Sequence, residues 1–369
     1  MKILVTGAKG FIAKNLIAEL RNRKYTDIFE FDRETDITQL EEFCKDTDFV
    51  FHLAGVNRPK ESSEFMEGNF GFTSQLLEIL KKHNNKCPVM ISSSIQAKLE
   101  NPYGESKKAG EDLLFSYCKE TEARVLVYRL PNVFGKWCKP NYNSAVATFC
   151  HNIARELPVQ VNDPSIKMNL VYIDDLVNEL INALEGNEYK EDMFCIVPIV
   201  HSITLGEIVE LIYSFKQSRE DRSVPNMSDD FTRKLYSTYL SYLPENQFSY
   251  DLKMNIDHRG SFTEFLKTPD RGQVSVNISK PGITKGNHWH HSKNEKFLVV
   301  SGNGVIRFRR IDSEEIIEYF VSCDKMVVID VPTGYTHNIE NYGDKDMVTI
   351  MWANESFDPN KPDTYYLEV

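Results

Sequence analysis

The first half of the chain alternates short apolar runs with segments of helical periodicity. The apolar runs lie at residues 3–5, 28–31, 49–53, 89–91 and 125–130. Between the first two, Ile12, Leu16 and Leu20 recur at helical spacing. Strands that alternate with crossover helices build a parallel sheet covered by helices on both faces. The pattern predicts a doubly wound, Rossmann-type α/β domain.

Beyond residue 250 the pattern changes. Strand-like segments follow one another with glycine-containing turns and without helical spacers at 273–278, 296–300, 305–309 and 325–331. This pattern predicts an antiparallel, all-β barrel or jelly roll. The polar segment Tyr239–Tyr250 is the most plausible junction, so the expected domains are residues 1–243 and 252–369.

Composition excludes several classes of function. The 369 residues carry a net charge of −11, which disfavours nucleic acid and anionic membrane surfaces as partners because both require concentrated positive charge. No apolar stretch is long enough for a signal peptide or a membrane span, and the seven cysteines form no CxxC pair. We therefore expect a cytoplasmic protein with reduced thiols.

A glycine-containing turn follows the first predicted strand and opens the first predicted helix. Residues 7–13 read Gly-Ala-Lys-Gly-Phe-Ile-Ala, and such a turn lets backbone and helix N-terminal amides approach a pyrophosphate. A turn without ligand is the alternative. Asp32 has about the spacing expected of an acid that contacts the ribose. The basic side chains of Arg33 and Lys9 could instead bind a 2'-phosphate, which favours NADPH over NADH.

Tyr103 and Lys107 lie one helical turn apart and therefore on the same face of a predicted helix. They follow a strand that ends at Ser94, so the hydroxyl, the phenol and the ammonium can meet at the carboxyl edge of the sheet. A nearby cation would lower the pKa of the phenol from about 10 toward working pH. Tyr103 would then protonate the alkoxide that hydride attack creates, while Ser94 binds the carbonyl oxygen.

With these motifs, residues 1 to about 240 resemble an extended short-chain dehydrogenase/reductase, a family that acts on nucleotide sugars. Further matching segments are 52–55 (His-Leu-Ala-Gly), 129–135 (Arg-Leu-Pro-Asn-Val-Phe-Gly) and 172–176 (Tyr-Ile-Asp-Asp-Leu). The cofactor-binding residues that the resemblance implies are Gly7, Gly10, Ile12, Asp32, Leu53, Ala54, Tyr103 and Lys107. The full set of candidate cofactor-binding residues adds Lys9, Phe11, Arg33, Gly55 and Asn69. It also implies Asn132 and Lys139 as substrate-binding residues, and a homodimer.

One departure from the family narrows the reaction. Members that eliminate water place an Asp-Glu pair directly after the catalytic hydroxyl, whereas here Ser94 is followed by Ile95 and Gln96. Neither side chain can act as the acid or the base of an elimination. Reduction of a 4-keto sugar, or 4-epimerisation with a retained cofactor, remains.

Four potential metal ligands lie close together in the C-terminal half. His288 and His290 are two residues apart in a predicted strand and share a face, Glu295 can return to that face, and His337 would come from a neighbouring strand. Three imidazoles and a carboxylate suit zinc, iron, manganese or nickel, with zinc favoured. Satisfied core histidines are the alternative.

The spacing of these ligands resembles the cupin family. The first motif runs from Gly282 through the three ligands to Gly302, and the second comprises Pro332, Gly334, His337 and Asn341. Met326 stands where the second motif normally opens with glycine. The resemblance spans about 260–355 and implies a jelly-roll barrel rather than one activity.

A reductase fused to a metal cupin resembles a group of enzymes that make capsular polysaccharide precursors. In that group the cupin domain epimerises C3 of a UDP-4-keto-6-deoxy-N-acetylhexosamine and the reductase domain then reduces C4 with NADPH, which yields a UDP-2-acetamido-2,6-dideoxy-L-talose-type product. Lys285, His291 and Tyr335 are candidate bases near the ligands, and the metal could be catalytic or structural.

Two other functional classes stay open. The chain could be a plain 4-ketoreductase whose barrel binds sugar or mediates assembly. It could also be a cofactor-sensing regulator, although a sensor has no need for the proton donor Tyr103.

Overall fold

The computed structural model describes residues 1–356, 358–360 and 362–369. The chain folds into two compact units, Met1–Tyr213 with Asp230–Pro244, and Ser214–Asp229 with Glu245–Val369. The segment 214–229 contacts the rest of the second unit through an ion pair of Arg222 with Glu264 at 3.0 Å and a β-bridge between Ser223 and Lys267. The predicted boundaries assign this segment to the first domain.

Among the described helices, none combines the length and the apolarity that crossing a bilayer requires.

The first unit is built on a seven-stranded sheet in the order β2-β1-β3-β4-β5-β9-β8. Its strands are β1 (Ile3–Thr6), β2 (Ile28–Phe31), β3 (Phe49–His52), β4 (Val89–Ser94), β5 (Val125–Leu130), β8 (Lys190–Glu191) and β9 (Phe194–Cys195). All neighbours are parallel except β8 and β9. The chain leaves β1 for β2 on one side and returns to β3 on the other. Ligands of such sheets bind outside the carboxyl ends of the two strands at this switch point.

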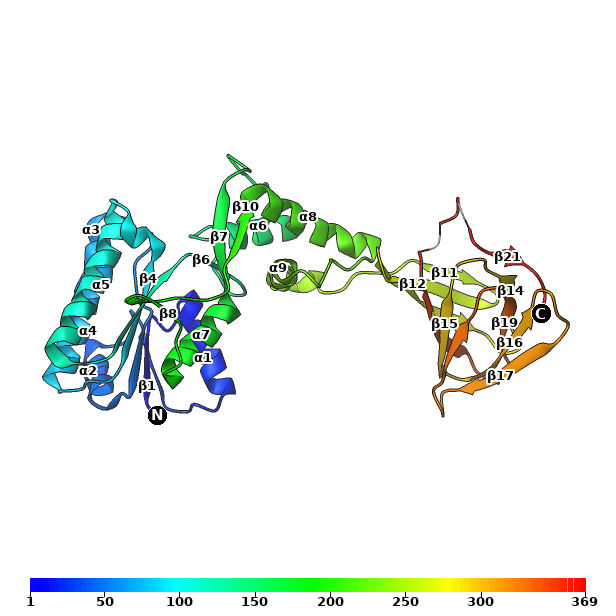
Figure 1. Cartoon of the computed structure of the whole chain (residues 1–369), viewed down its shortest axis with the longest axis horizontal. Coiled ribbons are helices and arrows are strands. Elements are labelled where there is room, and N and C mark those ends of the chain that lie inside the picture. Colours follow the sequence, from blue (N-terminus) through cyan, green and yellow to red (C-terminus); the bar gives the residue numbers. More distant parts are fainter. Residues whose placement is uncertain (357, 361) are drawn as a thin grey trace. The chain divides into compact units, whose positions relative to one another are not determined.

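Helices cover both faces of this sheet (Figure 1). One face packs against α1 (Phe11–Asn22) and α7 (Ile173–Glu185), and the other against α2 (Ile37–Asp46), α4 (Phe72–Lys82) and α5 (Pro102–Thr121). The two apolar clusters lie on opposite sides of β1, because Ile3 and Val5 belong to one and Leu4 to the other. The doubly wound prediction is confirmed.

The remaining elements of the chain before residue 250 are short or peripheral. They are α3 (Ser63–Phe65), the π-helix η1 (Met66–Gly71), η2 (Ile95–Lys98), β6 (Asn132–Phe134), α6 (Ala145–Ala154), β7 (Lys167–Tyr172), β10 (His201–Thr204), α8 (Leu205–Asp221), α9 (Asp230–Leu240) and η3 (Glu245–Gln247). Strands β10, β7 and β6 form a second, three-stranded sheet.

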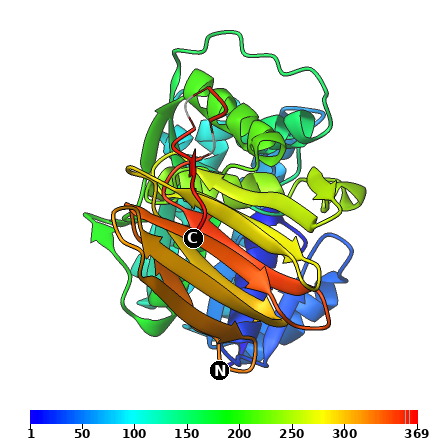
Figure 2. The ribbon, with the colours of Figure 1, turned by 90° about the vertical axis from the view of Figure 1, so that its right-hand side faces the viewer.

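The second unit is an all-β structure of two antiparallel sheets (Figure 2). Its strands are β11 (Met254–Asp257), β12 (Gly260–Thr268), β13 (Gly272–Ser279), β14 (Thr284–Trp289), β15 (Glu295–Ser301), β16 (Asn303–Arg310), β17 (Ile316–Ser322), β18 (Val328–Val331), β19 (Tyr335–Asn341), β20 (Met347–Ala353) and β21 (Tyr365–Tyr366). The sheet orders are β11-β12-β13-β20-β15-β18 and β17-β16-β19-β14-β21. The predicted antiparallel all-β class is confirmed.

The polar side of β13 is the buried side. Its buried polar side chains are Gln273, Ser275, Asn277 and Ser279. The apolar residues between them, at 274, 276 and 278, are only partly buried. This reverses the alternation of a sheet that buries an apolar face. A buried polar row needs hydrogen-bond partners, so the interior of this unit is suited to a polar ligand.

Candidate functional site

The loop between β1 and α1 has the geometry of a phosphate-binding turn. Gly7 has a φ of +67°, and a Cβ on it would lie 2.8 Å from the Cα of Ala54. A larger residue would therefore separate the loop after β1 from the loop after β3. Gly10 caps α1, whose first turn contains no acidic residue. The free amides of Phe11 and Ile12 open this helix, and they suit an anion.

Asp32 and its neighbours lie beside this turn. The carboxylate of Asp32 accepts hydrogen bonds from the backbone N–H groups of Lys9 at 2.8 Å and Arg33 at 2.7 Å. The side chain of Lys9 pairs with Glu34, whereas the side chain of Arg33 is exposed. The structure thus orients Asp32 toward the glycine turn and leaves the Arg33 guanidinium accessible.

Ser94, Tyr103 and Lys107 meet at the carboxyl end of β4. Ser94 ends β4 and hydrogen-bonds the phenol of Tyr103, which lies in the first turn of α5. The Lys107 ammonium lies 5.9 Å from the centre of the Tyr103 ring and donates a hydrogen bond of 3.1 Å to the carbonyl of Ser92. A Cβ on Gly104 would lie 2.2 Å from the Gln96 carbonyl oxygen, so this glycine permits the close approach.

The protonation of this group differs from the expectation. Burial raises the pKa of Tyr103, and the hydrogen bond with Ser94 offsets part of that rise. Burial also lowers the pKa of Lys107 to about 8, against the opposing charge of Glu111. The predicted lowering of the phenol pKa is therefore not found in this structure, because desolvation disfavours the phenolate by more than the Ser94 interaction favours it.

A buried hydrogen-bond chain supports the site from behind. His52 contacts Thr6 at 2.8 Å through Nδ1 and Thr73 at 2.9 Å through Nε2. Thr73 donates its own proton to the Asn69 carbonyl, so it accepts from His52, whose proton is then on Nε2. Burial lowers the pKa of His52 to about 3. The imidazole is neutral and holds β3 to β1.

The loop after β3 completes this region. The Asn69 side chain holds Val56 through two backbone hydrogen bonds, at 2.9 and 3.1 Å, and donates another to Ser106 at 3.0 Å. A Cβ on Gly55 would lie 2.9 Å from both the Asn69 amide oxygen and the Lys107 ammonium. The structure therefore shows Asn69 as a support of the loop that contains Leu53, Ala54 and Gly55.

The two predicted substrate residues lie on the next segment of chain. Asn132 begins β6, two residues after Leu130, and Leu130 lies opposite Ser94 in the sheet. Its side chain is exposed, as is that of Lys139, whose ammonium lies 5.5 Å from the Tyr142 ring centre. Asn132 is placed at the edge where Ser94 lies, and Lys139 is further along the loop.

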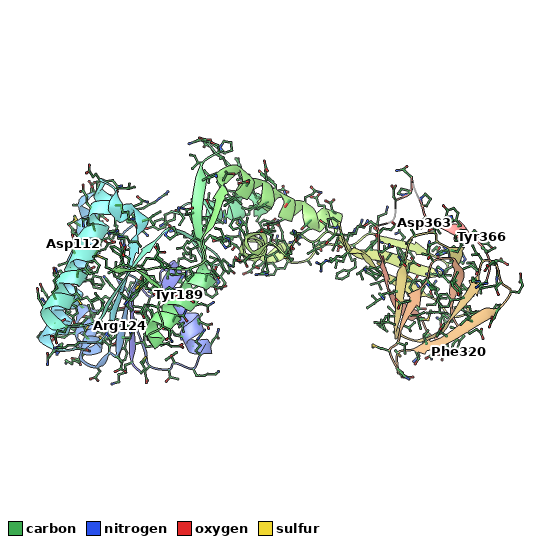
Figure 3. All side chains as sticks on the ribbon, viewed as in Figure 1. Asp112, Arg124, Tyr189, Phe320, Asp363 and Tyr366 are labelled. Atoms are coloured by element: carbon green, nitrogen blue, oxygen red, sulfur yellow. The ribbon has the colours of Figure 1, made fainter. Side chains whose placement is uncertain are left out.

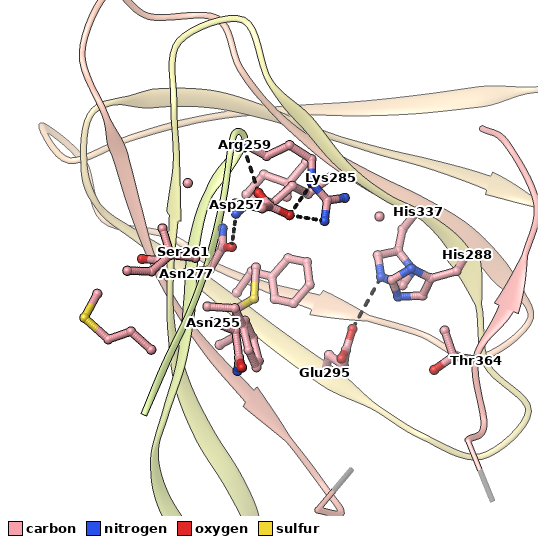
Figure 4. Close-up of a pocket in the computed structure, with 18 of the residues that line it drawn as sticks. Asn255, Asp257, Arg259, Ser261, Asn277, Lys285, His288, Glu295, His337 and Thr364 are labelled. Carbon is pink, nitrogen blue, oxygen red and sulfur yellow. Dashed lines mark hydrogen bonds and ion pairs between the residues drawn. The ribbon is translucent and has the colours of Figure 1, made fainter. Parts of the chain in front are cut away.

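The four predicted metal ligands converge inside the second unit. His288 and His337 are paired neighbours on β14 and β19, His290 follows β14, and Glu295 begins β15. One ligand atom of each residue lies within 4.8 Å of the others. A Glu295 carboxylate oxygen is 3.5 Å from Nε2 of His290 and 3.3 Å from Nε2 of His337. Figure 4 shows His288, Glu295 and His337 around one space.

The donor atoms fit a divalent cation. Nε2 of His290 and both ring nitrogens of His337 are buried without a hydrogen-bond partner among the described residues. Nδ1 of His290 hydrogen-bonds the Asp363 carbonyl, which places the proton there and leaves Nε2 as a lone pair. Buried polar nitrogens without partners are costly in a protein interior. A metal ion would satisfy Nε2 of His290 and one ring nitrogen of His337.

The ionisation states also fit. Burial raises the pKa of Glu295, but the adjacent His290 and His337 rings and the charge of Lys293 outweigh it and hold that pKa far below its ordinary value. Burial lowers the pKa of His288 to about 4. At neutral pH the cluster therefore offers a carboxylate and a neutral imidazole, the forms in which these groups bind metals.

The C-terminal segment fixes the turn that contains two of the ligands. The Asp363 carboxylate accepts from the backbone N–H groups of His291, Ser292 and Lys293 at 2.9, 2.7 and 2.8 Å. Figure 3 labels Asp363 in this segment. This contact was not predictable from the sequence, because Asp363 is about seventy positions away from its partners and belongs to no recognised motif.

A cavity of about 660 Å³ adjoins the ligand cluster. Its opposite wall carries Asp257, Arg259, Asn277 and Lys285 (Figure 4). The Lys285 ammonium donates to Asn277 and to the Ile278 carbonyl, both at 2.8 Å.

The three candidate bases differ in position. Lys285 lines this cavity. His291 is exposed and packs against Trp289 and Tyr365. Tyr335 packs against the apolar core of the unit. Of the three candidate bases, Lys285 is therefore the one positioned to contact a small molecule bound beside the ligand cluster.

Comparisons with known proteins cover the whole chain. Residues 3–194 match the NAD dependent epimerase/dehydratase family, and residues 255–365 match the polysaccharide biosynthesis C-terminal domain. The UDP-2-acetamido-2,6-beta-L-arabino-hexul-4-ose reductase of Pseudomonas aeruginosa is 45% identical over 369 residues, with 100% of this chain and 99% of the relative covered.

The solved structures agree. The capsular polysaccharide assembling protein CapF from Staphylococcus aureus superposes with a TM-score of 0.96 at 60% identity, and all of both chains is covered. CapF with the inhibitor 3-isopropenyl-tropolone gives a TM-score of 0.91 at 56% identity, again over both whole chains. The chain belongs to the NAD dependent epimerase/dehydratase family, in a CapF-like form that continues into a polysaccharide biosynthesis C-terminal domain.

Proposed function

We propose that this chain makes a capsular polysaccharide precursor from a UDP-4-keto-6-deoxy-N-acetylhexosamine in two steps. Residues 252–369, the proposed cupin domain, epimerise C3, and residues 1–243 then reduce the C4 ketone with NADPH. The observation that carries the proposal is that one chain holds both a Ser94, Tyr103 and Lys107 group and a four-ligand cluster beside a cavity. A relative of 45% identity named as a hexul-4-ose reductase supports the substrate class.

Reduction uses the residues at the end of β4. A bound NADPH supplies the hydride that adds to C4. Ser94 donates a hydrogen bond to the carbonyl oxygen, and Tyr103 gives its phenolic proton to the same oxygen as the C=O bond becomes a C–OH bond. The raised pKa of Tyr103 keeps the phenol protonated before transfer. The Lys107 ammonium stabilises the phenolate that remains.

The ligand cluster is proposed to hold a divalent metal, most plausibly zinc, through His288, His290, Glu295 and His337. A bound metal would act as a Lewis acid toward a substrate oxygen, or, with four protein ligands closing its shell, as a structural ion. CapF has been solved with the inhibitor 3-isopropenyl-tropolone, and a tropolone has adjacent hydroxyl and ketone oxygens, a donor pair that can chelate a cation.

Epimerisation requires a proton to leave C3 and to return on the opposite face. The C4 ketone acidifies this hydrogen, and the electrons of the C3–H bond form an enolate with C4. We assign proton removal to Lys285, because it lines the cavity and burial lowers its pKa. Later reduction of C4 removes the ketone and so fixes the configuration at C3.

A second candidate is a plain 4-ketoreductase whose C-terminal domain binds sugar without chemistry. The observation in its favour is that Lys285 donates two hydrogen bonds, to Asn277 and the Ile278 carbonyl. Both acceptors stabilise the ammonium form, which cannot take a proton. In this case the barrel would contribute affinity and no C3 exchange.

The deciding experiment follows C3 by NMR in D2O. Wild type with substrate and NADPH is expected to give reduced product with deuterium at C3. The double variant His290→Ala, His337→Ala is expected to lose the deuterium and still oxidise NADPH with a ketone that needs no epimerisation. Reduced product without C3 deuterium from wild type would support the plain ketoreductase.

A further inference from the structure

A second cavity of about 450 Å³ adjoins the ligand cluster within the same unit. It shares Asn255, Phe262, Lys293, Glu295 and Met351 with the first cavity. Because Glu295 and Lys293 line both, the second cavity lies directly beside the first and beside one of the proposed metal ligands. A substrate whose sugar reaches Glu295 can therefore extend into the second cavity.

The register of the six-stranded sheet gives the length of this extension. Glu295 of β15 lies opposite Ala353 of β20, and Ala353 lies opposite Gln273 of β13. The three side chains thus point to the same side of the sheet, and two strand spacings separate Glu295 from Gln273 by about 10 Å. Ala353 is the smallest possible chiral side chain between them. It leaves room for a ligand to lie across this row.

Two buried polar atoms in the second cavity lack partners among the described residues. They are Oε1 of Gln273 and Nε of Arg222. Gln273 is 5% exposed, and its Nε2 donates a hydrogen bond to the Ser275 hydroxyl at 3.0 Å. Its Oε1 is therefore a buried acceptor without a donor. Arg222 forms an ion pair with Glu264 at 3.0 Å, and its Nε–H is a buried donor without an acceptor. A ligand there needs both kinds of group side by side.

The remaining lining combines charges of both signs with aromatic surface, and its acidic members are Glu264, which pairs with Arg222, and Glu355. Lys253 and Lys293 add two ammonium groups, of which Lys293 lies 3.2 Å from Glu295. Phe262, which lies opposite Asn277 and so on the same side of the sheet as Gln273, adds an aromatic ring. Ammonium groups suit phosphate oxygens, and aromatic rings suit a flat heterocycle.

We propose that this cavity binds the nucleoside diphosphate end of the substrate, a UDP group, while the sugar lies at the metal ligands. The inference rests on the proposed function. Uracil carries an N–H between two carbonyl groups, which complements the Gln273 acceptor and the Arg222 donor. Lys253 and Lys293 bind the diphosphate, between the base and the sugar. The distance of about 10 Å along the row suits the span of a ribose and a diphosphate.

The test uses UDP as the probe and the full chain. Equilibrium titration of wild type is expected to show two UDP sites per chain, one in each unit. Gln273→Leu, which keeps the size of the side chain and removes the acceptor, and Lys253→Ala, at an exposed side chain, are each expected to weaken one of the two sites about tenfold. Lys280→Ala, an exposed lysine of the same unit outside both cavities, serves as the control.

A kinetic readout separates this inference from the proposed function. In C3 exchange without NADPH, the KM of the two variants is expected to rise about tenfold and by a larger factor than kcat falls, and inhibition by UDP is expected to weaken in parallel. One UDP site in wild type, or two sites of unchanged affinity in both variants, overturns the inference. Absence of C3 exchange with two UDP sites intact would overturn the proposed epimerisation and leave the nucleotide subsite supported.

Discussion

The two candidate sites treat their buried polar atoms in opposite ways. In the first unit, His52 and Asn69 find all their partners within the chain, from Thr6 to Ser106. In the second unit, nitrogens of His290 and His337 are buried without partners among the described residues.

This difference indicates which of the two sites requires a bound ligand for its stability. The first unit uses its buried polar groups to fix two loops, and it offers backbone amides and a phenol at the surface of that scaffold. The second unit leaves polar atoms unsatisfied inside a sheet, which costs free energy unless a ligand binds them. The reductase site should thus keep its structure without ligands, and the barrel should depend on them.

The largest effect is expected from a substitution that tests whether reduction in the first unit and C3 exchange in the second are independent. Tyr103→Phe removes the proposed proton donor, and NADPH oxidation is expected to fall 10²- to 10⁴-fold, the usual contribution of general acid catalysis. C3 deuteration in D2O should persist, because the barrel is unchanged. Tyr213→Phe, at an exposed tyrosine, is the control. Loss of C3 exchange in Tyr103→Phe would show that the two sites are not chemically independent.

The next prediction tests whether the stability of the second unit depends on the proposed metal. Metal present at 100 times its dissociation constant would stabilise the second unit by about 2.7 kcal/mol. Scanning calorimetry with a chelator is therefore expected to lower the transition of this unit and to leave that of the first unit in place. The His290→Ala, His337→Ala variant should no longer respond to the chelator. An identical wild-type trace with and without chelator would contradict the comparison.

A third effect should appear in the first unit and concerns pH. Burial lowers the pKa of His52 from 6.5 to about 3, so below pH 6.5 the unfolded chain binds a proton that the folded chain does not. Stability is therefore lost as pH falls from about 6.5 toward 3, by about 2 kcal/mol between pH 7.5 and 5. Urea unfolding at these two pH values measures the loss.

The variant His52→Asn should lose less stability over the same interval than wild type. His258→Asn, at an exposed histidine of the second unit, controls for the general effect of removing an imidazole. An equal loss in wild type and His52→Asn would show that His52 is not the group responsible.

The secondary structure and fold class of both units were predictable from the sequence, whereas many of their buried polar contacts were not. Parallel strands bury both faces, so apolar runs such as 125–130 identified β5 directly. The convergence of the four proposed metal ligands was also predictable in part, because His288 and His290 are two residues apart and so share one face of the chain. The inward polar row that contains Gln273 was not predictable, since period-two alternation gives two faces without stating which is inside. Contacts such as that of Asp363 with the ligand turn depend on chain closure over a long separation.

The smallest expected effect concerns cofactor choice at the first site. The exposed guanidinium of Arg33 lies next to Asp32, while the Lys9 ammonium is already paired with Glu34. If Arg33 binds the 2'-phosphate, Arg33→Ala should raise the dissociation constant of NADPH about tenfold, or about 1.4 kcal/mol, and leave that of NADH nearly constant. Lys9→Ala should have a smaller effect, because its partner Glu34 competes for the ammonium. Fluorescence titration with both cofactors measures this, and equal weakening of NADPH and NADH by Arg33→Ala would mean that the guanidinium contacts a part common to both.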